Sequence, residues 1–138
     1  MNNQLQSMLY NFLKVNQPLD SASGTALASA ARTATVSTSD ITNYGGHGLL
    51  VFFDSTASAA TPSIVMTIEG KDPASGKYYT ILASAAITGT ATNVYRVDPL
   101  LSAIANAIAK DLLPRTFRIT MTHSDADSIT YSVGYSIV

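Results

Sequence analysis

The sequence has no cysteine, and only 12% of its 138 residues are charged, about half the usual share. Without cysteine the chain cannot form disulfides, thiol nucleophiles or cysteine-ligated metal centres, which suits assembly in a reducing cytoplasm. A net charge of −1 gives no basic surface for nucleic acid. No apolar run approaches the roughly 20 residues of a membrane helix, and the N-terminus lacks the features of a signal peptide. We therefore expect neither a nucleic-acid nor a membrane partner.

Low charge is combined with a hydrophobic content of 46%. This combination favours a chain whose surface is partly covered by a partner, although a monomeric β protein rich in alanine, threonine and serine has a similar composition. The length predicts a single domain that buries roughly 68–70% of the surface of the unfolded chain.

The N-terminal segment predicts a short amphipathic helix over residues 2–15, ended by Pro18. Its apolar positions follow the i, i+3, i+4, i+7, i+8 pattern of one helix face, and they are our candidate partner-binding residues: Leu5, Met8, Leu9, Phe12 and Leu13. A helix this short is marginal alone in water, so it must dock, either onto its own domain or onto a neighbouring subunit. We assign residues 1–20 to a helical arm and linker, and residues 21–138 to the main domain.

Residues 63–84 predict a β-hairpin. Apolar and polar residues alternate over 64–69, and the stretch 78–82 is rich in β-forming residues. Between them, Asp72, Pro73 and Gly76 are typical of a tight turn, since proline presets φ and glycine accepts positive φ.

Further short strands are predicted over 30–37, 49–54, 93–97, 115–123 and 128–138. The stretch 49–54 is apolar on both faces, which is typical of a central strand covered on both sides. Seven or so short strands separated by turns predict a mostly β protein, namely an antiparallel β-sandwich of jelly-roll or immunoglobulin-like type, or a small barrel. The segment Asp98–Leu113 predicts a helix, because Asp98-Pro99 suits a helix start and its interior is rich in alanine; an ordered loop is the alternative.

Two groups of residues are candidates for binding a metal ion or a phosphate. His123, Asp125 and Asp127 have a spacing that could place two carboxylates and an imidazole on one side of a strand, but the aspartates are also typical turn residues. The glycine-rich stretch 44–48 could approach a phosphate, but it lacks the known phosphate-loop patterns and is better interpreted as a strand connection. We therefore predict no metal site and no cofactor.

Three further groups of residues are candidates for catalysis or binding. The carboxylates of Asp54, Glu69 and Asp72 are weak candidates for glycoside chemistry. The arginines at 96, 115 and 118 could pair with acidic residues across the sheet or remain solvated. The tyrosines could form a stacking platform for sugars, although core packing is the more common role: Tyr78, Tyr79, Tyr95, Tyr131 and Tyr135. We predict no catalytic residues and no enzyme activity.

Beyond these patterns, the sequence resembles small virion proteins encoded in the structural-gene regions of tailed bacteriophages. The resemblance covers about residues 25–138 and rests on TIEGKDPASGKYYTILASAAIT and LPRTFRITMTHSDADSITYSVGYSIV, supported by ASAARTAT and GLLVFFD. The N-terminal helix lies outside it.

The resemblance implies a structural protein of the virion, assembled in the host cytoplasm, and above all a capsid decoration or cement protein. It implies contacts with the major capsid protein or other virion proteins and a homo-oligomer, with a trimer favoured. A tail, neck or fibre-attachment component is the alternative within this class. A carbohydrate-binding module is the alternative from another class.

Overall fold

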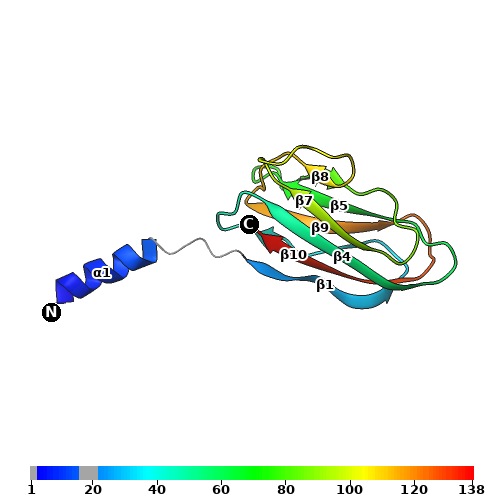
Figure 1. Ribbon diagram of the computed structural model, residues 1–138, viewed down its shortest axis with the longest axis horizontal. Coiled ribbons are helices and arrows are strands. Elements are labelled where there is room, and N and C mark those ends of the chain that lie inside the picture. The colour runs from blue at the N-terminus through cyan, green and yellow to red at the C-terminus, as the bar shows by residue number, and fades with distance from the viewer. Residues whose placement is uncertain (1–2, 16–21) are drawn as a thin grey trace.

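The structure is a computed structural model that describes residues 3–15 and 22–138, with the backbone alone described for residues 10–15. Figure 1 shows a sandwich of strands and, apart from it, the N-terminal helix. The elements are α1 (Asn3–Val15), β1 (Ser23–Arg32), β2 (Val36–Ser37), β3 (Ile41–Thr42), β4 (Leu49–Ser58), β5 (Ile64–Lys71), β6 (Tyr78–Ala83), β7 (Thr92–Val97), β8 (Ile108–Ala109), β9 (Thr116–His123) and β10 (Ile129–Ile137). Within the described ranges, no helix is both long and apolar enough to cross a membrane.

Two sheets pack face to face. The first has the order β1-β10-β4-β7-β8, and the second has the order β2-β9-β5-β6, with β3 also paired to β9. All pairs are antiparallel except β7 with β8. Because β1 pairs with β10 and β2 pairs with β9, the order is that of a jelly roll, whereas an immunoglobulin fold pairs its first strand with its second. The predicted antiparallel β-sandwich is therefore confirmed, and it is of the jelly-roll type.

The core lies between the sheets and follows the alternation in the sequence. In β5 every second residue is buried, and the same period continues in β9 and β10. The largest buried side chains from the four central strands are Leu49, Phe53, Ile64, Met66, Ile68, Phe117, Ile119, Met121, Ile129 and Tyr131.

Strand β4 corrects the expectation that its stretch is covered on both faces. Phe53 is fully buried, whereas its neighbour Phe52 is 43% exposed. The reason is that a two-layer sandwich has only one inner face per sheet, so Phe52 lies on the outer face. The weak strand predicted over 30–37 is also displaced: β1 spans Ser23–Arg32 and forms one edge of its sheet, since its small residues carry no alternation that marks its bounds.

The predicted hairpin is confirmed as β5, a turn and β6. The carboxylate of Asp72 accepts hydrogen bonds from the Ala74 amide (2.9 Å) and the Ser75 hydroxyl (2.6 Å). Gly76 has a φ of +71° and donates its amide to the Asp72 carbonyl at 2.8 Å. The turn thus forms through the residue types that predicted it.

The helix predicted over Asp98–Leu113 is wrong, and the alternative of an ordered loop is confirmed. The carboxylate of Asp98 does accept the Leu100 amide (2.8 Å), but Asn106 has a φ of +61°, outside the helical region. The segment instead covers the edge of β7: the amides of Arg96 and Asp98 each donate to its backbone carbonyls at 3.0 Å. An otherwise open sheet edge therefore decides the conformation, and helix propensity does not.

Candidate functional sites

Helix α1 carries apolar side chains that are exposed to solvent. Leu5, Met8 and Leu9 are 53%, 68% and 51% exposed. The side chains of Phe12 and Leu13, which complete the predicted face, lie outside the described residues. The predicted helix is confirmed, and its role in binding a partner remains a prediction.

A second group of exposed apolar side chains lies on the loop between β7 and β9. Its members are Leu100, Leu101, Ile104 and Leu112. The segment that carries them pairs its backbone with β7 and does not form the helix expected over Asp98–Leu113. This segment and helix α1 therefore both place apolar side chains in contact with water.

The outer face of the second sheet carries a polar network around Arg118. Its guanidinium lies 2.7 Å from the Glu69 carboxylate and 3.5 Å from the centre of the Tyr78 ring. Burial works to raise the pKa of Glu69, but the hydrogen bonds from Arg118 and Thr120 outweigh it and hold the pKa below its ordinary value. The prediction that Arg118 could pair with an acidic residue across the sheet is confirmed. Its partner is the carboxylate of Glu69 on the neighbouring strand β5.

The other carboxylates weighed for glycoside chemistry are held apart. Asp54, in the first sheet, accepts the Thr92 hydroxyl at 2.7 Å. Asp72 is committed to its turn, and Glu69 lies on the opposite sheet. Each of the three carboxylates is thus engaged by a different hydrogen-bond partner: Asp54 by Thr92, Glu69 by Arg118 and Asp72 by its own turn.

The turn after β9 uses its aspartates as turn residues. Asp125 accepts the Asp127 amide at 3.1 Å, and Asp127 accepts the Thr61 amide at 3.1 Å. His123 points elsewhere, with its Nε2 3.1 Å from the hydroxyl of Tyr131. In the described ranges, no three histidine or acidic side chains are placed to hold a metal ion.

Burial of the His123 ring lowers its pKa below the ordinary value of 6.5; nearby Asp125 opposes this shift and Arg32 adds to it. Its buried Nδ1 has no hydrogen-bond partner among the residues that the structure describes. Since the unfolded chain binds this proton more tightly, the stability that neutral His123 contributes is present above pH 6.5 and is lost as the pH falls toward the folded-state pKa.

We therefore expect the urea midpoint of the wild-type protein to decrease as the pH is lowered from 7 to 5. The midpoint of His123→Gln should decrease less over the same interval. His47→Gln, at an exposed histidine, is the matched control and should follow the wild type. Parallel curves for all three proteins would contradict this assignment.

The glycine-rich stretch 44–48 is a strand connection, as predicted. Buried Asn43 organises it: its Oδ1 accepts the amides of Gly45 (3.1 Å) and Gly46 (2.7 Å), and its Nδ2 donates to the Leu113 carbonyl (3.1 Å). A Cβ on Gly46 would lie 2.2 Å from Ile137, so only glycine fits against β10 there. The amides are turned toward Asn43 and the last strand, which leaves no phosphate cradle.

The tyrosines do not form the row that a stacking platform needs. Tyr78 and Tyr79 belong to the second sheet, while Tyr131 is fully buried in the first. Tyr95 is 6% exposed, and its side chain enters a pocket beside β7. The hypothesis of a tyrosine stacking platform is therefore wrong. One of these tyrosines, Tyr95, instead lines a pocket.

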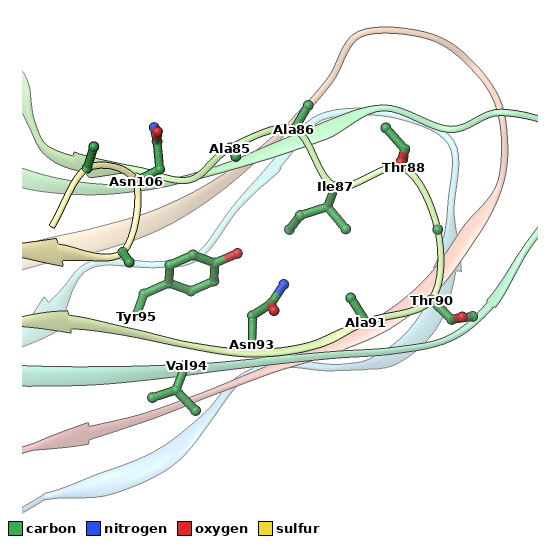
Figure 2. A pocket seen from close by; sticks show the side chains of 13 residues that line it. Ala85, Ala86, Ile87, Thr88, Thr90, Ala91, Asn93, Val94, Tyr95 and Asn106 are labelled. Atoms are coloured by element: carbon green, nitrogen blue, oxygen red, sulfur yellow. The ribbon is translucent and has the colours of Figure 1, made fainter.

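Figure 2 shows this pocket, which lies between residues 85–91, strand β7 and residues 105–107. Asn93 and Tyr95 project into it from β7, and Ile87 projects from the facing segment. The cavity is open on one side and has a volume of about 590 Å³, within the range of small-molecule sites. All 13 lining residues are uncharged.

Two buried serines fix the wall formed by residues 85–91. Ser84 accepts the Met66 amide at 2.9 Å and donates to the Ala85 carbonyl at 2.8 Å. Ser55 accepts the Ala91 amide at 2.7 Å and donates to the Gly89 carbonyl at 3.0 Å. The pocket wall is thus tied to the sandwich at both ends. No sequence pattern distinguishes these two serines from the many others in the chain.

The opposite wall is held by Asn106, whose side-chain amide donates to the Ala83 carbonyl at 3.1 Å. The Ala107 carbonyl accepts the Arg96 amide at 3.0 Å. Both walls are therefore preorganised by hydrogen bonds that leave the side chains of Asn93 and Tyr95 directed into the cavity (Figure 2).

No protein-family model and no curated protein matches the sequence. Among solved structures, the chain is similar to the SPBc2 prophage-derived protein YomS, at 12% identity over 86% of this chain and 94% of YomS, with a TM-score of 0.48. It is also similar to chains from structures of infectious bursal disease virus. The Gx strain gives 11% identity and a TM-score of 0.50, and the Gt strain gives 13% and 0.46; each match covers 86% of this chain.

The chain spans 32–33% of the length of the virus chains. At these identities the likeness concerns the fold alone. The match with a TM-score of 0.50 agrees with the sandwich architecture described above.

Proposed function

We propose that this protein is a non-enzymatic structural component of a virus particle, a decoration or cement protein of a bacteriophage head that docks through α1. The observation that carries the proposal is the exposed apolar face of that helix, with Leu5, Met8 and Leu9 each more than half exposed. The resemblance of residues 25–138 to small phage virion proteins supports it. The jelly-roll order supports it as well, since viral coat domains commonly use this architecture.

The energetics favour a docked helix. A helix of 13 residues is marginal in water, whereas fully burying a leucine or methionine side chain contributes about 1.5–3 kcal/mol. Contact with a neighbouring subunit or with the major capsid protein would therefore stabilise both the helix and the assembly. The exposed loop residues Leu100 and Leu112 provide a second apolar region for such contacts.

We expect deletion of residues 1–16 to leave the sandwich folded and to weaken oligomerisation or binding to particles. Light scattering after size exclusion, on the full-length and the shortened protein, measures oligomerisation. A homotrimer has three times the 14.5 kDa of the chain. Co-sedimentation with phage particles that lack this protein measures binding to particles. Sedimentation with isolated tails instead of heads would support the tail or neck role.

Single substitutions separate the apolar face from the helix itself. Leu9→Asp should mimic the deletion, because it places a charge in the docking face. Gln6→Asp, at an exposed polar position of the same helix, is the matched control and should assemble normally. Unchanged oligomers and unchanged particle occupancy in both Leu9→Asp and the deletion would refute docking through α1.

A further inference from the structure

We propose that the pocket beside β7 binds a neutral sugar of monosaccharide size. This inference does not depend on the role in a virus particle, since it rests on the pocket alone. It differs from a tyrosine platform because the ligand would enter a cavity and would not stack on a surface (Figure 2).

The pocket contains polar groups that the protein does not use. Tyr95 is 94% buried, yet its hydroxyl makes no hydrogen bond to any residue in the described ranges. The side-chain amide of Asn93 is likewise without a protein partner there, although both side chains point into the cavity (Figure 2). Neither polar end is sealed from solvent, because His123 Nδ1 is the only buried side-chain nitrogen or oxygen without a partner in the described ranges. The hydroxyl of Tyr95 and the amide of Asn93 therefore face the open pocket, where a ligand or water can provide their partners.

The chemistry of the lining selects the class of ligand. No lining side chain is charged, so nothing is present to pair with a phosphate, a carboxylate or an ammonium group. The amide of Asn93 and the hydroxyls of Tyr95, Thr88 and Thr90 can each donate and accept, as sugar hydroxyls also do. The methyl groups of the alanines that line the walls suit the carbon–hydrogen faces of a sugar ring.

The site is also rigid enough to bind a small ligand. Ser55 and Ser84 fix one wall and Asn106 fixes the other, so little ordering is required when the ligand enters. A pocket formed by mobile loops would lose this advantage.

The test is a titration of the ¹⁵N-labelled full-length protein with glucose, galactose, mannose and N-acetylglucosamine, followed by amide chemical shifts. We expect at least one of these sugars to give saturable shifts confined to residues 85–95 and 105–107. Acidic N-acetylneuraminic acid should bind at least tenfold more weakly, because no lining residue can pair with its carboxylate. At about 50 mM, a site with a dissociation constant of about 1 mM is almost saturated.

Two variants locate the binding. Tyr95→Phe keeps the buried ring and removes the hydroxyl, and Asn93→Ala removes the amide; each should weaken binding about threefold to tenfold. Tyr79→Phe removes an exposed hydroxyl outside this pocket and is the matched control. The absence of saturable shifts with all four sugars would overturn the proposal. Sugar affinity equal to that of the wild type in both Tyr95→Phe and Asn93→Ala would overturn it as well.

Discussion

Replacing Phe53 by alanine is expected to lower the free energy of unfolding by about 3–5 kcal/mol, the range observed for fully buried aromatic residues. Phe53 is 0% exposed, and its ring lies 5.5 Å from that of Tyr131, which is equally buried. The deletion leaves a cavity between the two sheets, which the paired backbones of β4 and β10 cannot close by collapse. Urea unfolding followed by circular dichroism measures the loss.

The adjacent residue provides the control. Phe52→Ala removes the same side chain from the outer face of the same strand, where it is 43% exposed, and should cost far less. If the two substitutions destabilise the protein equally, the assignment of the inner and outer faces of β4 is wrong.

Replacing Asn43 by alanine is expected to cost about 2–4 kcal/mol, because each buried polar group left without a partner costs about 1–3 kcal/mol. The substitution removes the acceptor for the amides of Gly45 and Gly46 and the donor to the Leu113 carbonyl. Solvent can rehydrate the exposed Gly45, but it has little access to buried Leu113.

Asn43→Asp separates the two roles. It keeps the acceptor for the glycine amides and loses the donor to Leu113, and it also introduces a buried charge. We expect a loss in stability comparable to that of the alanine variant at pH 7, with part of it recovered as the pH is lowered and the carboxyl is protonated. A stability near that of the wild type in Asn43→Ala would show that the side chain does not organise the loop.

Local patterns predicted most of the strands, and the physical reason is that each strand has one buried face. Some features are properties of short segments and can be recognised from the sequence alone. They include the alternation over β5, β9 and β10 and the turn-forming residues Asp72 and Gly76. The strand order is not, because the pairing of β1 with β10 joins Ser23 to Ser136.

The incorrect predictions also concern features that depend on contacts between residues far apart in the sequence. The segment Asp98–Leu113 has helix propensity, but the amides of Arg96 and Asp98 at the edge of β7 require partners, and only the fold reveals that edge. The apolar face of α1 was predicted from its period, whereas the pocket beside β7 was not predicted. Its walls depend on Ser55 and Ser84, which nothing in their surroundings distinguishes from other serines.

The strand order also sets the sequence of events during synthesis. β9 lies between β5 and the two short strands β2 and β3 in one sheet, and β10 lies between β1 and β4 in the other, yet these two are the last strands of the sandwich in chain order. Until they emerge, the earlier strands keep open edges and neither sheet can close. Such long-range pairing folds in milliseconds to seconds, so the sandwich must find its register while exposing strands that can aggregate. Neither sheet can therefore be completed before β9 and β10 have been synthesised.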